Sequence, residues 1–406
     1  MRILLINAFH YPRGGVERIY FDESRWLAGA GHDVLHFAIR DPRNLPSPTA
    51  GYFAPPADYG EGGDPWRQLG QLGRVVWSKP AEDAMARLVA DQRPDVAHVH
   101  APSRYLTPSI LRPLARAGVP VVMTLHDFKP WCTNRVMFAR GAPCERCKGG
   151  RHWHALAVGC VQDSHARSAV AMAEAYAHDL AHAYGPVRLW IAPSRFVAAK
   201  VAEHGLDPAR VRLLPHGLES NVAESRAADD GRYTLYAGRL SVEKGVRILP
   251  ALAMRLSPRP VWVAGEGPLA GWLQDQAGSL PNLKRLGRLE GAEFARTLRA
   301  AGVVVVPSLS YETFCFAAAE ALAAGRPVVA SRIGAIPELI EHERTGLLVP
   351  PGDAHALAEA VERTLDDDAA AQRWAAAGRA HVAALAAPGT HLAGLLAIYE
   401  EARGAR

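Results

Sequence analysis

The chain has 406 residues, of which 49% are hydrophobic and 21% are charged. This is the composition of a globular protein, and the length exceeds that of one ordinary core, so two or three domains are expected. The formal net charge of +5 and the sequence pI of about 9.0 allow an anionic partner without identifying it. The sequence contains no helix-turn-helix, zinc-finger or RNP-type motif, which disfavours nucleic acid as that partner.

The positive charge is concentrated in one part of the chain. Residues 129–215 contain twelve Lys or Arg against six Asp or Glu, a local excess of +6. A solvated basic surface and a peripheral contact with anionic lipid both explain this excess, and the sequence does not choose between them. The N-terminus has no secretory signal pattern, and no run approaches the roughly 18 apolar residues of a membrane span. We therefore expect a cytoplasmic protein, with any membrane contact on the inner face of the cell membrane.

The first half of the chain alternates between strands and helices. A strand over Arg2–Asn7 is followed by a glycine-containing loop with Gly14 and Gly15, and then by an amphipathic helix and a second strand. Further buried strands are expected over residues 95–100, 119–125, 188–192 and 211–214. Residues 41–77 are rich in Pro and Gly, and they predict a long loop that is either an ordinary surface insertion or a wall of an acceptor site. Helix–strand alternation predicts an α/β fold with a parallel sheet.

The second half repeats this alternation after a polar, aperiodic segment at residues 219–231, which we interpret as a linker. Strands are expected over residues 233–237, 261–264, 282–286, 303–306, 327–330 and 346–349. The first of these strands leads into GRLSVEKG, where Arg239 and Lys244 are five residues apart in a loop with glycine at both ends. Two cations at this spacing can converge on one diphosphate and stabilise its charge as a glycosidic bond breaks.

Two glutamates lie at the turn from the strand at 303–306 to an alanine-rich helix expected over residues 314–324. Glu312 falls in the loop and Glu320 in the helix, about 12 Å apart along a helix axis, which is too far to hold one small group. They could hold the two ends of a nucleotide sugar. The backbone N–H groups near Phe314, Cys315 and Phe316 would then face the diphosphate, because a helix N-terminus attracts anions.

The string PSLSYETFCFAAAEALAAGRPVVAS, residues 307–331, is similar to the E-x7-E signature of the retaining glycosyltransferases of family 4. GRLSVEKG resembles the donor-phosphate motif of the same family. The resemblance implies the GT-B fold, in which two Rossmann-like domains face each other across a cleft. It divides the chain into a first domain at 1–218, the linker at 219–231, a nucleotide-sugar domain at 232–385 and a C-terminal helix at 386–406 that crosses back to the first domain.

The resemblance also implies roles for residues on the donor side. Glu312 would contact the donor sugar and Glu320 the ribose, while Arg239 and Lys244 would steady the departing diphosphate without a catalytic metal. His126, which ends the strand at 119–125, matches a family histidine close to the donor sugar and transition state. The other donor-binding residues that follow from the resemblance are Gly14, Gly15, Gly287, Arg288, Leu289, Phe314, Cys315 and Phe316. The nucleotide base would lie near the Gly287–Leu289 backbone.

On the acceptor side, Gly14, Gly15 and Glu17 match the family's GGxE loop, and His10 is close by in sequence. We expect His10, Glu17, His100 and Arg195 to line the acceptor site. Ser194, directly before Arg195, is best interpreted as a helix N-cap.

Four cysteines distinguish this chain from a generic member of the family. Cys132, Cys144, Cys147 and Cys160 give the spacing C-x11-C-x2-C-x12-C inside an expected insertion at residues 128–162. In a reducing compartment a structural zinc site is our first interpretation, and an iron–sulfur cluster or reduced cysteines without metal are the alternatives. His152, His154 and His165 are near enough in sequence to replace one ligand. Transferases from bacterial polysaccharide gene clusters look similar in this segment.

These observations predict a retaining glycosyltransferase that moves a sugar from a UDP- or GDP-sugar to a hydroxyl acceptor in polysaccharide or glycoconjugate assembly. The basic excess and the gene-cluster resemblance suggest a lipid-linked oligosaccharide as acceptor. Two other classes stay open, namely a GT-B epimerase and a non-catalytic scaffold. A dehydrogenase is disfavoured because no GxGxxG follows either opening strand with an acidic residue about 20 positions further on.

Overall fold

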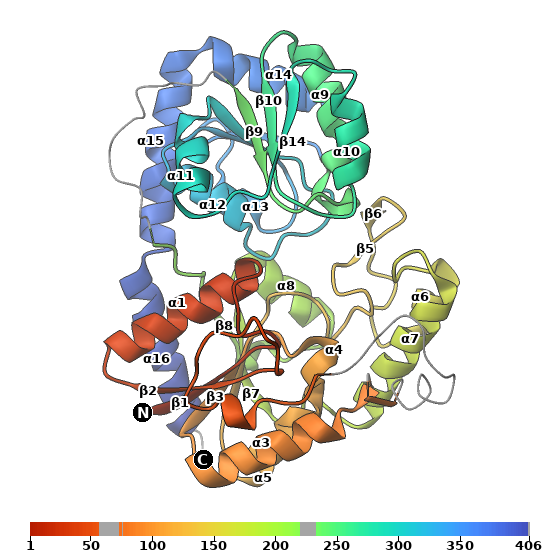
Figure 1. Ribbon diagram of the computed structural model, residues 1–406, viewed down its shortest axis with the longest axis vertical. Coiled ribbons are helices and arrows are strands. Elements are labelled where there is room, and N and C mark those ends of the chain that lie inside the picture. The colour runs from red at the N-terminus through yellow and green to blue at the C-terminus, as the bar shows by residue number, and fades with distance from the viewer. Residues whose placement is uncertain (57–72, 75, 220–232, 405–406) are drawn as a thin grey trace. The chain divides into compact units, whose positions relative to one another are not determined.

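The computed structural model describes residues 1–56, 73–74, 76–219 and 233–404. The chain forms two compact units (Figure 1). The N-terminal unit contains Met1–Met137, Glu145–His216 and Gly389–Arg406, and the C-terminal unit contains Phe138–Cys144 and Gly217–Pro388. Most of the expected linker at 219–231, and residues 57–72 and 75 of the expected long loop, lie outside the described residues.

The N-terminal unit is built on a six-stranded parallel sheet in the order β2-β1-β3-β4-β7-β8. Its strands are β1 (Arg2–Ile6), β2 (Asp33–Phe37), β3 (Val96–Val99), β4 (Val121–Thr124), β7 (Val187–Ala192) and β8 (Val211–Leu213). Its helices are α1 (Gly15–Gly29), α3 (Lys79–Gln92), α4 (Ser103–Leu106), α5 (Leu111–Arg116), α6 (Trp153–Val158), α7 (His165–Leu180), α8 (Arg195–Glu203) and α16 (Pro388–Gly404). The central strands are buried on both faces, as expected for strands of a parallel sheet between helices.

Helix α16 belongs to the N-terminal unit although it ends the chain. Leu395, Ile398 and Tyr399 are buried in one cluster with Ile3 and Leu5 of β1. This packing returns the C-terminus of the chain to its first strand.

The C-terminal unit repeats the design with a second six-stranded parallel sheet, ordered β11-β10-β9-β12-β13-β14. Its strands are β9 (Thr234–Ala237), β10 (Val261–Ala264), β11 (Leu283–Gly287), β12 (Val303–Val306), β13 (Val328–Ser331) and β14 (Leu347–Val349). Its helices are α9 (Leu249–Leu256), α10 (Ala270–Ala277), α11 (Gly291–Ala300), α12 (Phe316–Ala323), α13 (Ile336–Leu339), α14 (Ala354–Asp366) and α15 (Asp368–Leu385).

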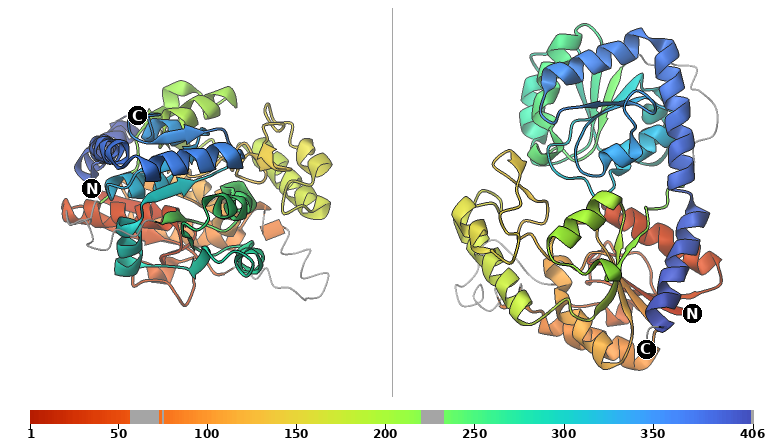
Figure 2. Two further views of the ribbon diagram at one scale, coloured as in Figure 1. Left: turned by 90° about the horizontal axis from the view of Figure 1, so that it is seen from above. Right: turned by 180° about the vertical axis from the view of Figure 1, so that it is seen from behind.

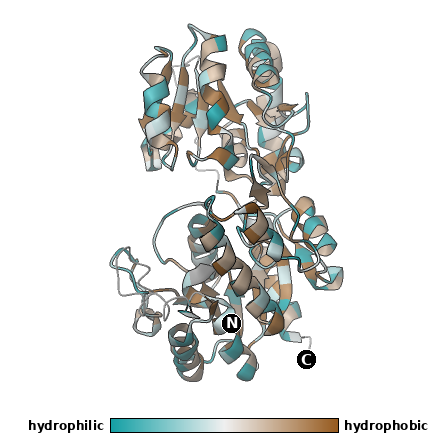
Figure 3. Ribbon diagram, turned by 90° about the vertical axis from the view of Figure 1, so that its right-hand side faces the viewer, coloured by the Kyte–Doolittle hydropathy of each residue, from teal (hydrophilic) through white to brown (hydrophobic). Residues whose placement is uncertain are grey.

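Helices cover both faces of each sheet (Figure 2). In the C-terminal unit this gives two hydrophobic clusters, one containing residues of α12 and the other residues of α9 and α14. Hydrophobic residues are frequent on the strands, and the helices carry both hydrophobic and hydrophilic residues (Figure 3). Because all the strands of each sheet are parallel, their carboxyl ends lie at one edge, where ligands bind in open α/β sheets.

A two-stranded hairpin interrupts the cysteine-rich segment. Its strands are β5 (Phe138–Ala139) and β6 (Ala142–Pro143), and they pair antiparallel. The residues Phe138–Cys144 group with the C-terminal unit, whereas the chain on either side groups with the N-terminal unit. The segment expected as one insertion of the first domain is thus divided between the two units.

One helical stretch of the described residues, Asp368–Gly404, is long and apolar enough to cross a membrane by length and composition alone. The sequence was expected to contain no apolar run of such length, so this stretch differs from that expectation. A core helix passes the same test, and Trp374, Val382, Leu395 and Tyr399 within this stretch are buried against the protein.

Candidate active site

The expected donor-phosphate and glutamate motifs meet in the C-terminal unit. Lys244 Nζ lies 2.6 Å from Glu312 Oε1, and Ser308 Oγ donates a hydrogen bond of 2.6 Å to the same oxygen. Burial opposes the charge of Lys244, but Glu312 outweighs it and raises the pKa of the ammonium group above its ordinary value. A lysine that stays charged beside a carboxylate can bind a phosphate oxygen and a sugar hydroxyl at neighbouring positions.

Glycines bring the loops with Lys244 and Glu312 together. Gly245 has φ +72°, and a Cβ at this position would lie 1.8 Å from the carbonyl oxygen of Pro307. Gly334 has φ +60°, and a Cβ there would lie 2.5 Å from the backbone nitrogen of Glu312. Only glycine allows such close approach at these angles. The loop contact is completed by hydrogen bonds from the backbone N–H groups of Leu309 and Ser310 to the Glu243 carbonyl.

Arg239 lies in a loop held by the GEG turn after β10. Gly265 and Gly267 have φ +140° and +158°, and a Cβ on either would clash with the backbone carbonyl of Gly238 or Leu240. The Leu240 N–H also donates to the Glu266 carbonyl at 2.9 Å. These contacts show that the glycines of the GEGP segment position the Arg239 loop. Arg239 itself is exposed and has no ion pair with any described residue.

Helix α12 begins at Phe316, two residues later than expected, because Cys315 adopts φ +75° at the N-cap. This left-handed conformation is unusual for a residue with a side chain, so the backbone is strained here. Burial raises the pKa of the Cys315 thiol to about 12. Phe314 is buried, and Phe316 and Glu320 are half-buried. The left-handed backbone at Cys315 could not be predicted from the sequence, because residues other than glycine rarely adopt it.

The expected base-binding residues lie where β11 ends. Gly287 is the last residue of this strand and has φ +72°, and its carbonyl accepts a hydrogen bond from the Gly265 N–H at 2.7 Å. Arg288 is exposed and pairs with Glu290 at 2.6 Å, while Leu289 is half-buried. This segment therefore continues the edge that carries the Arg239 loop, and its role in base binding stays a prediction.

In the N-terminal unit the GGVE loop leads into α1. Gly14 and Gly15 are exposed, and Glu17 in the first turn is buried. Glu17 Oε1 accepts a hydrogen bond of 3.3 Å from Asn7 Nδ2, at the end of β1. The glycines leave the N-terminus of α1 accessible, while Glu17 is fixed to the sheet.

A buried histidine network follows β3 and β4. His100 Nδ1 lies 3.1 Å from His126 Nε2, and the His126 ring stacks on His216 with centroids 5.0 Å apart. Burial, together with His216 and His100, holds the pKa of His126 well below its ordinary range. His126 is therefore neutral near pH 7 and can exchange hydrogen bonds with a sugar without carrying positive charge.

The network is anchored by Glu23 of α1, which is 1% exposed. Glu23 Oε2 lies 3.3 Å from His98 Nδ1 and 3.4 Å from His100 Nε2, and Oε1 lies 3.0 Å from His391 Nε2 of α16. Burial opposes the charge of Glu23, but His100 and His98 hold its pKa well below the usual range. His391 Nδ1 also faces the Pro215 carbonyl at 2.7 Å, so both ring nitrogens must donate and the ring is an imidazolium.

Glu23, His98 and His100 form the one set of three described residues whose potential metal-ligand atoms all lie within 4.8 Å of one another. His98 is already engaged, because Nδ1 lies 2.7 Å from the Tyr399 hydroxyl and Nε2 lies 2.7 Å from the Thr124 hydroxyl. We interpret the set as a buried network of ion-pair contacts around Glu23, in which Glu23 Oε2 and His100 Nε2 have no hydrogen-bond partner among the described residues. Sequence reasoning missed Glu23 and His391 because each lies on a helix with nothing to mark it, although HVH at the end of a buried strand was a visible signal.

Two of the expected acceptor residues differ in accessibility. His10 is 2% exposed, its Nδ1 lies 2.9 Å from the Tyr20 hydroxyl, and burial lowers its pKa to about 4. Arg195 is exposed at the start of α8, and Ser194 caps that helix by accepting from the Val197 N–H, as expected. The acceptor roles of both residues stay predictions, and the burial of His10 favours a packing role.

The cysteines do not form a compact set of metal-ligand atoms among the described residues. Cys132 is buried, and burial with the nearby Cys147 and Cys160 raises the pKa of its thiol to about 12. Cys144 follows β6 and is half-buried. His152 pairs with Asp179 at 2.8 Å, and His165 Nδ1 donates to the Leu156 carbonyl at 2.7 Å.

Two Rossmann-like units, with a charged pair beside a helix N-terminus in the second, define a glycosyltransferase of the GT-B class. The chain belongs to glycosyltransferase family 4. The family model described as Glycosyltransferase Family 4 matches residues 13–221, and the model described as Glycosyl transferases group 1 matches residues 231–367.

Curated relatives span nearly the whole chain. A glycogen synthase of Mycobacterium tuberculosis (strain H37Rv) is 31% identical, over 93% of this chain and 89% of the relative. A phosphatidyl-myo-inositol mannosyltransferase of Mycolicibacterium smegmatis is 27% identical, over 91% of this chain and 86% of the relative. Activity as a glycosyltransferase follows from this family membership.

Solved structures share the fold. Sucrose-phosphate synthase from Thermosynechococcus elongatus superimposes with a TM-score of 0.72 at 22% identity, and each chain is covered completely. Anabaena HepE in complex with UDP and glucose gives a TM-score of 0.68 at 18% identity, over 99% of this chain and 100% of that chain. These likenesses confirm the expected GT-B fold.

Proposed function

We propose that this protein is a retaining glycosyltransferase that moves a sugar from a nucleoside diphosphate to a hydroxyl acceptor. The observation that carries the proposal is the contact of Lys244 with Glu312, held by the glycines of two loops. The pair places a cation and a sugar-binding carboxylate within one small site. The solved structure of HepE with UDP and glucose supports a nucleotide-sugar donor.

In the reaction that we propose, the bond between the sugar C1 and the diphosphate oxygen breaks, and the acceptor oxygen bonds to C1 on the same face. The acceptor proton passes to the departing diphosphate, so no side-chain base is needed. Lys244 and Arg239 stabilise the negative charge that develops on the diphosphate. Glu312 binds hydroxyl groups of the donor sugar and keeps Lys244 charged, and Glu320 binds the ribose.

His126 has a different role in this scheme. Its pKa lies well below the ordinary range, so the ring is neutral near pH 7. A neutral imidazole can hydrogen-bond to the sugar ring or its hydroxyls and hold it for attack. It cannot add to the positive charge near the diphosphate, which leaves that task to Arg239 and Lys244.

Nucleotide titration tests the donor site. We expect UDP or GDP to bind with a micromolar Kd in calorimetry, and dTDP and ADP as competitors test selectivity for the base. Arg239→Ala should weaken the affinity at least tenfold, since a charge-assisted hydrogen bond contributes about 1.5–3 kcal/mol. Arg255→Ala is the matched control, because Arg255 is exposed on α9, pairs with Glu362 at 3.1 Å and is not among the expected donor residues. Binding of no nucleotide, or equal binding by the Arg239 variant, would contradict the proposal.

Transfer assays test the catalytic assignments. With the donor identified by titration, Glu312→Ala and Lys244→Met should each lower kcat about 10²- to 10³-fold, the usual effect of losing one electrostatic contact to a transition state. Circular dichroism should show an intact fold in both variants. Product stereochemistry by NMR checks retention of configuration at C1, and conversion of the donor without an acceptor would indicate an epimerase instead. The names of the relatives favour transfer over epimerisation or a scaffold role.

For the acceptor we propose a lipid-linked oligosaccharide on the cytoplasmic face of the cell membrane, in cell-surface polysaccharide or glycoconjugate assembly. The net charge of +6 over residues 129–215 supports contact with anionic lipid. Cosedimentation with phosphatidylglycerol vesicles should decrease as salt is raised from low ionic strength. Binding that is absent at low salt would contradict the membrane proposal while leaving the donor site untouched.

We also propose a structural zinc ion held by Cys132, Cys144, Cys147 and Cys160. Their spacing and the proximity of Cys147 and Cys160 to Cys132 support it, although the described sulfur atoms do not gather into a closed set. Elemental analysis should give about one zinc per chain, lost in Cys147→Ser and retained in Cys315→Ser. Iron in place of zinc would favour a cluster, and metal-free protein with an intact fold would show reduced cysteines alone.

A further inference from the structure

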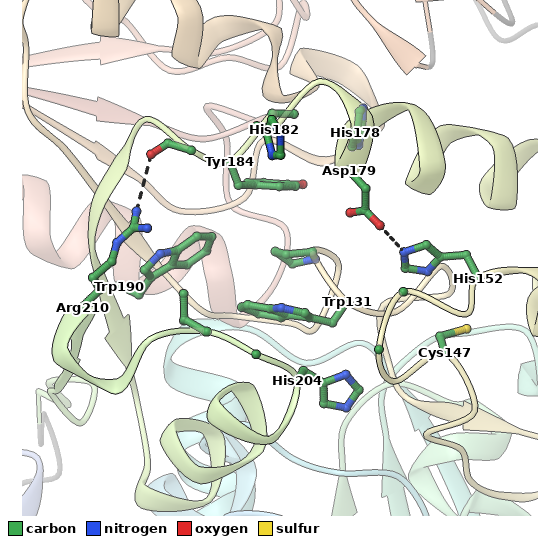
Figure 4. A pocket seen from close by; sticks show the side chains of 17 residues that line it. Trp131, Cys147, His152, His178, Asp179, His182, Tyr184, Trp190, His204 and Arg210 are labelled. Carbon is green, nitrogen blue, oxygen red and sulfur yellow. Dashed lines mark hydrogen bonds and ion pairs between the residues drawn. The ribbon is translucent and has the colours of Figure 1, made fainter.

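A cavity lies entirely within the N-terminal unit, apart from all the residues assigned above to the donor. Its volume is about 420 Å³, within the usual range for small-molecule sites. Its walls come from the chain after β4, the CxxC turn, the end of α7, β7 and the turn after α8. Figure 4 shows Trp190 on one side of the space and the pair His152–Asp179 on the other.

Aromatic rings form much of the wall. The centroids of Trp131 and Trp190 lie 5.6 Å apart with their planes tilted by 48°, and Tyr184 lies 6.1 Å from Trp190. Trp131 is half-buried, so part of its indole faces the cavity rather than the core. Such faces bind flat apolar surfaces, including the C–H face of a sugar ring.

Three polar atoms in this wall have no hydrogen-bond partner among the described residues. They are Trp190 Nε1, His152 Nδ1 and His204 Nε2. Trp190 is 2% exposed and His152 is 3% exposed, so bulk water does not reach most of either side chain. An unpartnered buried polar atom costs about 1–3 kcal/mol, and three around one cavity indicate a polar occupant.

The hydrogen bonds that these atoms can make indicate which chemical groups the occupant carries. His152 Nε2 lies 2.8 Å from the Asp179 carboxylate and donates to it, so Nδ1 is the ring nitrogen that has no partner among the described residues. Trp190 Nε1 can only donate. A ligand must therefore accept from Trp190 Nε1, and a hydroxyl group can do so and can also pair with His152 Nδ1 whether that nitrogen accepts or donates. Asp179 disfavours an anion, and Arg210 is already occupied by the carbonyl oxygens of its own unit.

We propose that this cavity binds one neutral sugar ring of the acceptor glycan, stacked on Trp131 and hydrogen-bonded to Trp190 and His152. The sugar-binding chemistry stands on the cavity itself, and its assignment to the acceptor rests on the function proposed above. A growing chain held here through an internal sugar would be retained near the enzyme between transfers.

The test is binding of methyl glycosides of glucose, galactose, mannose and N-acetylglucosamine, measured by saturation-transfer NMR and calorimetry. We expect at least one glycoside to bind near 1 mM, the affinity of a few good contacts, and Trp131→Ala to weaken it about tenfold. Trp153→Ala is the matched control, because Trp153 is 51% exposed on α6 and does not line the cavity. Trp190→Phe keeps a ring and removes the N–H, and should weaken binding about threefold to tenfold.

The outcomes separate this inference from the proposed function. No saturable binding, equal binding by Trp131→Ala, or equal competition by glycerol would overturn it. If Trp131→Ala fails to fold by circular dichroism, Trp190→Phe decides the case. Nucleotide binding without glycoside binding would reject the cavity alone, and glycoside binding without nucleotide binding would reject the donor proposal and keep the cavity as a sugar site.

Discussion

Replacement of Gly245 by alanine tests whether the close approach of two loops creates the Lys244–Glu312 pair. Gly245 has φ +72°, and a Cβ there would lie 1.8 Å from the Pro307 carbonyl oxygen. The left-handed backbone alone costs a residue with a side chain about 1–2 kcal/mol. Because normal contact begins near 3.5 Å, the Lys244 loop must also move by about 1.5 Å, at a further cost of about 1–3 kcal/mol. We expect a loss of about 2–5 kcal/mol in the free energy of unfolding.

The matched control is Gly291→Ala. Gly291 has φ +53°, but a Cβ there meets no atom within 4 Å, so only the backbone cost of about 1–2 kcal/mol applies. Urea unfolding gives the two free energies, and calorimetry with UDP and GDP gives the effect on the site. Displacement of Lys244 should weaken nucleotide binding about tenfold to a hundredfold in Gly245→Ala and leave it unchanged in Gly291→Ala. Equal losses of stability, or full affinity in Gly245→Ala, would refute the reasoning.

Three further predictions follow from single contacts. Burial lowers the pKa of His98 to about 4 and of His216 to about 3, so the unfolded chain binds more protons than the folded chain below pH 6.5. The free energy of unfolding should therefore fall on acidification by up to about 1.4 kcal/mol per pH unit for each ring. Urea unfolding between pH 7.5 and 5 checks this, and a free energy of unfolding that rises on acidification would contradict it. His391→Gln should cost about 3–5 kcal/mol because it leaves Glu23 as a buried carboxylate without its imidazolium, and the double variant with Glu23→Gln should cost less than the sum of the two single losses. Cys315→Gly should change the free energy of unfolding by less than about 1 kcal/mol, because glycine adopts φ +75° without strain. Cys315→Val should lower it by more than about 2 kcal/mol, because valine is β-branched. Similar values for both variants would argue against the strained N-cap.

The sequence predicted features that depend on local pattern. Val303–Val306 is a strand as expected, because four consecutive β-branched residues suit a buried parallel strand and are too few for a helix. The Lys244 and Glu312 motifs meet because each follows a strand of the same sheet, and strands β9 and β12 are direct neighbours. The two motifs and the strand order of a parallel sheet were together sufficient to predict that Lys244 and Glu312 lie close together.

What the sequence did not disclose depends on contacts between distant segments. Glu23 occupies an ordinary position in an amphipathic helix, and only the return of α16 brings His391 within 3.0 Å of it. The glycines of GEGP look like a turn until Gly265 and Gly267 are seen against the Arg239 loop. A pattern along the chain carries no information about which backbone will approach it, so both features required the structure.

The two units differ in the charged groups that their expected site residues carry. Burial keeps His126 and His216 neutral in the N-terminal unit, and both ring nitrogens of the His391 imidazolium are already engaged by Glu23 and the Pro215 carbonyl, so none of these three rings offers free positive charge. In the C-terminal unit Glu312 keeps Lys244 charged, and Arg239 is exposed. Under the proposed function, charge that develops on a departing diphosphate would thus be stabilised by Arg239 and Lys244, and His126 would discriminate among sugars by hydrogen bonding. Variants of His126 should accordingly change sugar selectivity more than nucleotide affinity, and the reverse should hold for Arg239.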